Sequence, residues 1–293
     1  RKILFSAFKK NIASEVRVAQ FSGYVSEHTL YHHGEVSLNG AIVNMAQTYV
    51  GSNNINLLMP NGQFGTRLLG GKDAASARYI YTNLNPITRY IYPDMDDDIL
   101  KYKTEENKQV EPSHYIPIIP MILVNGAKGI GTGFSTDIIP CNPIDVIQHL
   151  MDRLNHSTCY TSLKPYYKGF GGSIQSISGN RYIVKGVYEK INTNTILITE
   201  LPIGTWTTCF KTHLDKLMSI EKNKCRNAIK HYIDNSTDIV VNIKITFHVG
   251  KLETLSKIDL NEHDCNGIEK YLNLYTIISN NNMSFFIKSI KLF

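Results

Sequence analysis

The sequence lacks the marks of a disulfide-rich, zinc-binding or membrane-spanning protein. Its 293 residues include only five cysteines, scattered along the chain with no Cys-x-x-Cys pair. An odd number of isolated cysteines predicts free thiols in a reducing compartment and no zinc site. The longest apolar stretch, residues 115–124, is short and interrupted by two prolines. We therefore expect neither a membrane span nor a signal peptide.

A strong charge of one sign is also missing. The chain has 31 Lys and Arg against 25 Asp and Glu, a net charge of +6, which is compatible with a nucleic-acid partner but does not identify one. Glycines are frequent over residues 126–133, but no Gly-Lys-Ser or Gly-Lys-Thr follows them, so a nucleotide-binding loop is not expected. With 42% hydrophobic and 19% charged residues, the composition predicts one or two globular domains with a substantial core.

Three helices are expected near the start of the chain, over residues 2–11, 16–28 and 37–50. The sequence begins at Arg1, inside the first of them and without a methionine, so we expect a fragment of a longer protein. One face of the third helix is small or polar and carries no charge: Ser37, Gly40, Asn44, Gln47 and Thr48. A solvated face usually carries Lys or Glu, so the pattern favours a helix that enters a DNA groove. A plain amphipathic core helix is the alternative.

The rest of the pattern alternates strands and helices. Strands are expected over residues 55–59 and 117–125, and turns and residues 70–82 lie between them. Asn142 and Pro143 are typical of a helix start, and the helix that follows has an apolar stripe of Ile144, Ile147, Met151 and Leu154. Later strands are expected over 171–177, 181–188, 195–201 and 239–247, and later helices over 207–218 and 252–260. This order predicts an α+β protein, with a winged helix-turn-helix domain followed by an α/β domain.

Residues 70–82 (Gly-Gly-Lys-Asp-Ala-Ala-Ser-Ala-Arg-Tyr-Ile-Tyr-Thr) combine an adaptable basic loop with a tyrosine beside an arginine. An activated phenol oxygen can attack a phosphodiester, and a guanidinium can neutralise the phosphate oxygens in the transition state. Tyr79 and Arg78 are the candidates for these roles. The chain has 17 tyrosines, however, and a half-buried strand residue is the alternative for any one of them. Tyr81 lies two residues on, on the same strand face, and spacing does not separate it from Tyr79.

Other residues suggest contacts with a nucleic acid. Arg67 and Lys72 are the cations of a glycine-rich loop, suited to phosphate contacts, with solvated charges as the alternative. Ile130 is an apolar residue at the tip of a glycine turn, which suits a wedge that inserts between base pairs and kinks the duplex. Residues 94–98 are acidic, but consecutive aspartates in a turn are typical of a solvated loop, so no metal site is predicted in this chain.

Several longer strings of residues carry a family resemblance. The strings are Tyr-His-His-Gly-Glu (31–35), Val-Gly-Ser-Asn-Asn (50–54), Pro-Asn-Gly-Gln-Phe-Gly-Thr-Arg (60–67), Gly-Gly-Lys-Asp (70–73), Ala-Arg-Tyr-Ile-Tyr-Thr (77–82), Met-Ile-Leu-Val-Asn-Gly (121–126), Gly-Ile-Gly-Thr-Gly (129–133) and Leu-Pro-Ile-Gly-Thr-Trp-Thr (201–207). Together they resemble the type IIA DNA topoisomerases, most closely the eukaryotic topoisomerase II branch. The resemblance is dense up to about residue 140 and thin beyond it.

The resemblance assigns roles to individual residues. It implies that Tyr79 is the nucleophile, that Arg78 stabilises the transition state and that His33 supports them. The isoleucine that the family inserts into DNA corresponds to Ile130. Tyr31 and Ser37 correspond to family positions that meet DNA near the break.

The resemblance also implies an architecture and a set of partners. Residues 1–138 would form the winged-helix domain, and residues 139–293 an incomplete tower domain. The family's ATPase, toprim and exit-gate domains would lie elsewhere in the full protein, and Mg²⁺ and ATP would bind there. We expect double-stranded DNA as substrate, a homodimer, the remaining domains in cis, and an intracellular location, in the nucleus or, for a viral protein, in the host cytoplasm. Alone, the fragment is expected to bind DNA with little or no cleavage.

Two other functions compete with this interpretation. A non-catalytic winged-helix module that bends DNA would use the same fold, with Tyr79 as a bystander. A tyrosine recombinase would need a scattered set of arginines and histidines around the tyrosine, which the sequence does not present. The first is the main alternative, and the second ranks last.

Overall fold

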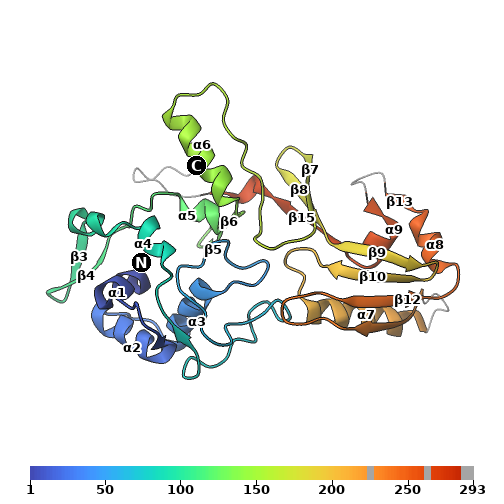
Figure 1. Ribbon diagram of the computed structural model, residues 1–293, viewed down its shortest axis with the longest axis horizontal. Coiled ribbons are helices and arrows are strands. Elements are labelled where there is room, and N and C mark those ends of the chain that lie inside the picture. Colours follow the sequence, from blue (N-terminus) through green and yellow to red (C-terminus); the bar gives the residue numbers. More distant parts are fainter. Residues whose placement is uncertain (223–227, 261–264, 285–293) are drawn as a thin grey trace. The chain divides into compact units, whose positions relative to one another are not determined.

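The computed structural model describes residues 1–222, 228–260 and 265–284. Helices and sheets are mixed throughout, as the α+β prediction requires (Figure 1). The chain forms two compact units that are interleaved in sequence. The first comprises Arg1–Gly65, Gly71–Ala127 and Pro140–Tyr167, and the second comprises Thr66–Gly70, Lys128–Ile139 and the described residues from Lys168 onward. The short segments 66–70 and 128–139 thus belong to the second unit, although the residues on both sides of each belong to the first.

The first unit is mainly helical. Its helices are α1 (Lys2–Lys10), α2 (Val18–Thr29), α3 (Glu35–Ala46), α4 (Ile87–Ile91), the 3-10 turn η1 (Asp94–Ile99), α5 (Met121–Val124) and α6 (Pro143–Leu154). Its strands form two small antiparallel sheets, β1 (Val16–Arg17) with β2 (Tyr81–Thr82), and β3 (Tyr102–Glu105) with β4 (Lys108–Pro112).

Apolar residues at helical spacing bring α1, α2 and α3 together. Phe21 and Val25 of α2 and Ile42 of α3 are fully buried in one core, which also receives Leu58 and Ile80 from the loops that follow. Burial of such side chains contributes roughly 1.5–3 kcal/mol each. The first two helices end in residues with left-handed backbone conformation, Asn11 and Leu30, a common way to satisfy the last carbonyl groups.

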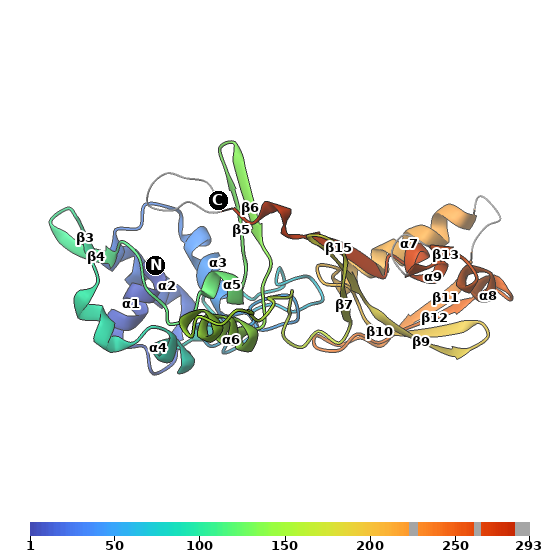
Figure 2. The same ribbon diagram turned by 90° about the horizontal axis from the view of Figure 1, so that it is seen from above.

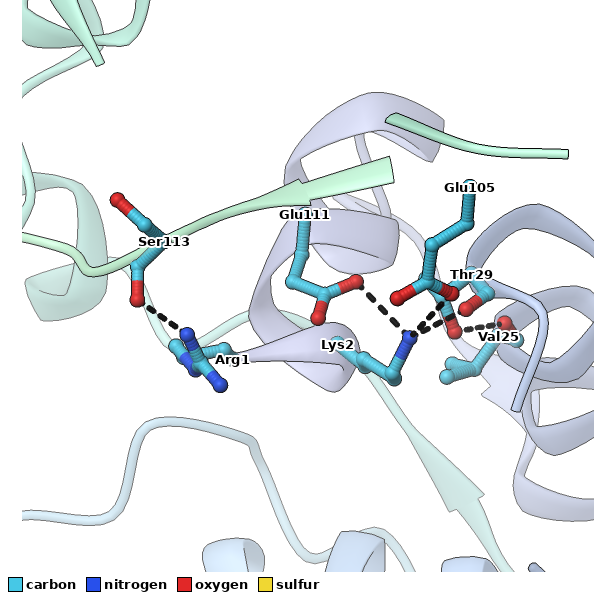
Figure 3. A network of polar contacts seen from close by, with 7 residues as sticks. All are labelled: Arg1, Lys2, Val25, Thr29, Glu105, Glu111 and Ser113. Atoms are coloured by element: carbon cyan, nitrogen blue, oxygen red, sulfur yellow. Dashed lines mark hydrogen bonds and ion pairs between the residues drawn. The ribbon is translucent and has the colours of Figure 1, made fainter. Parts of the chain in front are cut away.

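A polar network fastens the β3–β4 hairpin to the helices (Figure 3). The Lys2 ammonium lies 3.0 Å from the carboxylate of Glu111 and 3.8 Å from that of Glu105, and it also donates to the carbonyl of Thr29 at the end of α2. The Thr29 hydroxyl in turn donates to the carbonyl of Val25 over 2.7 Å. Because Glu111 is buried, its charge requires this partner.

The second unit is built on antiparallel sheets. Its described elements are β6 (Phe134–Ile138), which pairs with β5 (Ala127–Gly131), then β7 (Ser173–Ser178), β8 (Arg181–Lys185), β9 (Val187–Asn192), β10 (Thr195–Glu200), α7 (Thr207–Lys222), β11 (Ile229–Asp234), β12 (Ile243–Phe247), α8 (Lys251–Ser256), β13 (Asp259–Leu260), β14 (Cys265–Asn266), α9 (Gly267–Tyr271), β15 (Tyr275–Ser279) and the turn η2 (Asn280–Asn282).

Alternating side chains give this unit its core. The largest described sheet has the order β11-β12-β10-β9, and a second one has the order β15-β8-β7. Along β12, Ile243, Ile245 and Phe247 are buried whereas Lys244 is exposed, as the two-residue period of a strand requires. Phe210 and Leu214 of α7 are buried in the same cluster, so α7 covers the buried face of the larger sheet (Figure 1).

Several sequence-based element predictions need correction. Residues 55–59 do not form a strand, because they are held by a single bridge between Leu58 and Leu84 and by side-chain hydrogen bonds. The apolar segment 117–125 contains the short helix α5, and the strand β11 was not predicted. The third helix ends at Ala46, after which Gln47 is extended.

The structure confirms the predicted cap of α6 but not a buried apolar stripe. Asn142 caps it as predicted, accepting the amide hydrogen of Ile144 over 3.0 Å. The predicted apolar stripe is exposed within its unit, with Ile144 at 72% and Leu154 at 78%. Among the described residues, no helix combines the length and the apolar character that crossing a membrane would need.

The core of α3 provides a test of this packing. We expect Ile42→Ala to lower the free energy of unfolding by about 2–4 kcal/mol, because it removes a fully buried side chain. Val36→Ala on the same helix is the matched control, since Val36 is 86% exposed, and it should change stability by less than about 0.5 kcal/mol. Urea unfolding followed by circular dichroism measures both. Equal losses for the two variants would contradict the packing described.

Candidate functional site

Tyr79 projects from a tight turn at the surface of the first unit. Its side chain is 71% exposed, whereas the next residue, Ile80, is 1% exposed and packs in the core. The amide of Tyr79 donates to the carbonyl of Ser76 over 2.9 Å. The turn closed by the Ser76 carbonyl and the burial of the Ile80 side chain leave the Tyr79 ring facing solvent.

The turn is attached to the start of α2. The amide of Val18 donates to the carbonyl of Ile80, and the amide of Ala19 donates to the carbonyl of Ala77, both over 3.0 Å. The first amide groups of a helix have no partner within the helix, so the turn supplies acceptors that α2 needs. Tyr79 lies between the two attachment points.

The two neighbouring tyrosines differ in their surroundings. The Tyr81 hydroxyl accepts a hydrogen bond from the Arg17 guanidinium over 3.0 Å, and the same guanidinium lies 5.5 Å from the centre of the Tyr81 ring. The Tyr79 hydroxyl has no hydrogen-bond partner among the described residues. Arg78 is exposed beside it, with its guanidinium carbon 5.9 Å from the Tyr79 ring centre. The structure thus offers the Tyr79 oxygen to a ligand and ties the Tyr81 oxygen to the protein.

Close packing of glycines shapes the loop that leads to this turn. A Cβ atom on Gly65 would lie 2.5 Å from the Cα of Gly71, and both residues have positive φ angles. A Cβ on Gly71 would meet the hydroxyl of Tyr49 at 2.7 Å. Burial, with a contribution from the charge of Asp73, raises the pKa of the Tyr49 hydroxyl above its ordinary value. Tyr49 therefore stays protonated and supports the loop.

The predicted residues of the α3 start lie next to the same part of α2. The rings of Tyr31 and His33 meet edge to face at 5.4 Å between centroids. A small cavity between α2 and α3 is lined by Ala19, Tyr31 and His33, and Ala19 is also the residue that binds the Tyr79 turn. His33 and Ser37 are exposed and Tyr31 is half-buried. His33 thus lines a cavity that extends along α2 from Ala19 to Ser26, and the Tyr79 turn is bound at the start of the same helix.

The exposed face of α3 beyond Ser37 is uncharged. Val36 precedes Ser37 and is also exposed, and Gly40 and Asn44 follow it on the helix. Gln47, which was predicted to share this face, is instead buried, and its side-chain amide donates to the carbonyl of Phe64 over 2.9 Å. The reason is that α3 ends at Ala46, before the predicted end at residue 50. Gln47 therefore lies outside the helix and does not follow its spacing.

The two cations of the glycine-rich loop have different environments. Lys72 is exposed and forms no ion pair among the described residues. The Arg67 side chain is 7% exposed and its guanidinium pairs with Glu200, at the end of β10. Glu200 also accepts hydrogen bonds from the amides of Gly171, over 3.1 Å, and Leu201, over 2.9 Å. Arg67 was predicted to contact phosphate, but the structure gives it a buried protein partner instead.

The segment around Arg67 is held by further contacts within the second unit. The amide of Thr208 donates to the carbonyl of Leu68 over 3.1 Å. A Cβ on Gly70 would lie 2.2 Å from the ring of Trp206. The Thr-Trp-Thr string at residues 205–207 therefore packs against the residues that precede Lys72. From the sequence alone, this string is recognised only by its family resemblance.

Asparagines of two motifs hold the first unit together near the start of β5. The buried Asn54 amide donates to the carbonyls of Val124, over 2.8 Å, and Tyr166, over 3.0 Å. Asn125 exchanges two hydrogen bonds with the backbone of Ile55, of 2.9 and 2.8 Å. Both asparagines belong to motif strings, residues 50–54 and 121–126, but the sequence alone does not show that they hold the backbone in place.

Ile130 lies on β5 in the β5–β6 hairpin of the second unit. It is 92% exposed, the highest exposure of any described large apolar residue. The ammonium of Lys128 and the carboxylate of Asp137 pair across the hairpin at 2.9 Å. Phe134, on the other strand, is 52% exposed. The hairpin thus presents an apolar tip on a polar stem.

The described part of the chain shows no cluster of metal ligands. Within these ranges, no group of three or more His, Cys, Asp or Glu side chains is placed to hold a metal ion. In the acidic segment, the carboxylate of Asp97 pairs with the guanidinium of Arg89 at 2.9 Å.

The sequence matches the family model for the A subunits of DNA gyrase and topoisomerase IV over residues 1–292. The chain belongs to this family. Similar proteins include DNA topoisomerase 2 of Drosophila melanogaster, 45% identical over 286 residues, which cover 98% of this chain and 19% of that protein. DNA topoisomerase 2 of Acanthamoeba polyphaga mimivirus is 41% identical over 312 residues, covering 88% of this chain and 25% of that protein. The chain thus spans a quarter or less of these two topoisomerases.

A solved structure shows the same fold. The crystal structure of the Plasmodium falciparum topoisomerase II DNA-binding, cleavage and re-ligation domain matches with a TM-score of 0.92 and 44% identity, covering 99% of this chain and 38% of that chain. This match confirms the predicted fold class for the topoisomerase chain, a winged-helix part followed by a tower part.

The buried pair of Arg67 and Glu200 gives a test of the second unit. We expect Arg67→Met alone to destabilise this unit by about 3–5 kcal/mol, because the carboxylate would stay buried without its partner. The double variant Arg67→Met/Glu200→Leu should recover most of that loss, since neither charge remains. Thermal and urea unfolding measure both variants. A loss below about 1 kcal/mol for the single variant would show that the guanidinium is free in solution.

Proposed function

We propose that this chain is the part of a type II topoisomerase that binds, cleaves and rejoins DNA, with Tyr79 as its nucleophile. The observation that carries the proposal is the environment of the Tyr79 turn. Its hydroxyl is exposed and unpartnered among the described residues, the Arg78 guanidinium lies beside it, and backbone hydrogen bonds to α2 fix the turn. Family membership and the match to a cleavage and re-ligation domain support the same conclusion.

The reaction is a transesterification. The Tyr79 oxygen attacks a backbone phosphorus, a tyrosyl O–P bond forms, and the bond between phosphorus and the 3′ oxygen breaks. The phenol proton leaves to solvent or a nearby base, and the departing 3′ oxygen takes up a proton. The products are a 5′-phosphotyrosyl strand and a free 3′ hydroxyl, so the reverse attack rejoins the strand without an external energy source.

The neighbouring groups have separate roles in this step. Arg78 neutralises the phosphate oxygens as charge builds up on them, and it is free to do so because no carboxylate pairs with it among the described residues. His33 lines the cavity that reaches Ala19 of α2, and it supports the reacting groups as a hydrogen-bonding partner. Lys72 contacts a phosphate and positions the duplex.

DNA binding uses the start of α3 and the β5–β6 hairpin. Tyr31 and Ser37 contact DNA beside the break, and the uncharged face of α3 enters a groove. Ile130 inserts between base pairs and bends the duplex, which its 92% exposure permits. Arg67, buried against Glu200, supports the loop rather than a phosphate.

Other parts of the full protein complete the activity. We propose a homodimer, in which two Tyr79 residues cleave the two strands, a second duplex passes, and both breaks are rejoined. Mg²⁺ and ATP bind to other domains of the same protein, outside this chain. For this chain we propose an intracellular location, in the nucleus or, for a viral protein, in the host cytoplasm. One similar protein is named a mitochondrial topoisomerase and another comes from a virus.

A DNA-bending module without chemistry is the second candidate. The exposed Ile130 favours it equally, because a wedge bends DNA whether or not a strand is cut. The covalent intermediate separates the two candidates.

The nucleophile is tested in the full-length enzyme on end-labelled duplex. We expect Tyr79→Phe to abolish protein-linked 5′ ends on a denaturing gel, because it removes the attacking oxygen and little else. Tyr81→Phe is the matched control, and it should retain most of the adduct, since the Tyr81 hydroxyl is already bound to Arg17. Adduct formation by Tyr79→Phe would refute the assignment. If the wild-type enzyme forms no adduct, the DNA-bending module is the correct function.

The phosphate contact is tested by salt dependence. We expect Lys72→Met to weaken DNA binding uniformly across sequences and to reduce the slope of log affinity against log salt by about 1. Arg67→Met/Glu200→Leu is the control and should leave that slope unchanged, because this guanidinium does not face solvent. Fluorescence anisotropy over a salt series measures both. A reduced slope in the control would return Arg67 to the phosphate contacts.

A further inference from the structure

The hairpin that carries Ile130 is intrinsically weak. A lone two-stranded hairpin is at best marginally stable in water, and strand β5 of this one contains Gly129 and Gly131, which weaken it. The ion pair between Lys128 and Asp137 is exposed, and exposed pairs add little. A wedge on such a stem needs outside support if it is to resist the DNA that it separates.

The structure shows a support on the second strand of the hairpin. The side-chain amide of Asn282 donates to the hydroxyl of Ser135 over 2.8 Å, and the carbonyl of Asn282 accepts from the hydroxyl of Thr136 over 3.3 Å. The amide of Ser284 donates to the same Thr136 hydroxyl over 3.2 Å. Three hydrogen bonds therefore join the end of η2 and the residues after it to β6. All of these residues belong to the second unit, and Figure 2 shows the segment after β15, in dark red, beside the β5–β6 hairpin.

The turn η2 is held in place by the sheet that precedes it. It directly follows β15, which pairs with β8 over five consecutive positions, from Tyr275 opposite Lys185 to Ser279 opposite Arg181. The amide of Asn280 donates to the carbonyl of Asn180 over 2.8 Å, and the Ser279 hydroxyl accepts from the amide of Asn281 over 3.2 Å. The position of Asn282 is thus set by a three-stranded sheet.

We propose that Asn282, with Ser135 and Thr136, is a brace that holds the wedge hairpin at a fixed angle and thereby controls DNA bending. Asn282 is a positioning residue, since it acts on Ile130 through the hairpin and does not touch DNA itself. This inference rests on the proposed role of Ile130 as the wedge. It adds that the second unit, through β15 and η2, determines how well the wedge resists the duplex.

The expected effects follow from the size of single hydrogen bonds. One such bond changes an equilibrium by about fivefold. Asn282→Ala, which removes the bond to Ser135, should lower the ratio of bent to straight DNA by about fivefold at saturating protein. Ser135→Ala/Thr136→Val, which removes all three hydrogen bonds from the hairpin side, should lower it by about tenfold or more.

The test uses the full-length enzyme and a duplex with a fluorophore at each end, so that energy transfer reports the bent fraction. Asn281→Ala is the matched control, because this neighbouring side chain is exposed and makes no hydrogen bond among the described residues. Ile130→Ala is the control for the wedge. A duplex that is already kinked by an unpaired base should restore binding and bending to Asn282→Ala, a rescue that a general loss of folding would not give.

The outcomes separate the brace from the proposed function. The brace is supported if both brace variants lose bending, Asn281→Ala does not, and the kinked duplex rescues them. The brace is overturned, with the wedge retained, if Ile130→Ala loses bending while both brace variants bend DNA as well as wild type. If Ile130→Ala bends DNA normally, the wedge assignment fails and the brace fails with it. Should Asn282→Ala not fold, the hairpin-side variant decides.

Discussion

The structure depends on the attachment of one turn to the start of one helix. The first amides of α2 need acceptors outside the helix, and the carbonyls of Ala77 and Ile80 supply them. Ile80 enters the core at the same place, so Tyr79 between the two attachments faces outward. A stable helix terminus and the exposed Tyr79, the proposed nucleophile, thus come from the same two hydrogen bonds. The hydrogen bonds that complete the start of α2 also fix the turn that carries Tyr79.

Most supporting contacts around the site are made by uncharged residues. Glycines at positions 65 and 71 pack backbone against backbone, and Asn54 and Asn125 bind carbonyl groups through their amides. Uncharged amides can be buried at lower cost than charges when their hydrogen bonds are satisfied. This arrangement leaves Arg78 and Lys72 without carboxylate partners in the described part of the chain, which is what a phosphate-binding surface needs. The exception, Arg67, is buried with its own carboxylate.

The sequence predicts local features well where one principle acts alone. The cap of α6 at Asn142 and the helices α1 and α2 follow from local pattern and are confirmed within a few residues. Prediction fails where distant residues decide. No local pattern shows that Glu200 is the partner of Arg67, that Gln47 lies beyond the end of α3, or that segment 128–139 belongs to the second unit. The proposed cleavage residues Arg78 and Tyr79 lie in a motif string, whereas Asn282 lies in none.

The most direct test of the central claim is the chemical identity of the DNA-linked residue. The covalent complex of the full-length enzyme with DNA would be trapped, digested with nuclease and trypsin, and analysed by tandem mass spectrometry. Trypsin cuts after Arg78 and Arg89, so one peptide contains both Tyr79 and Tyr81, and its fragment ions tell them apart. We expect the phosphonucleotide mass on Tyr79. The same mass on Tyr81, or on a residue outside this peptide, would contradict the proposed mechanism.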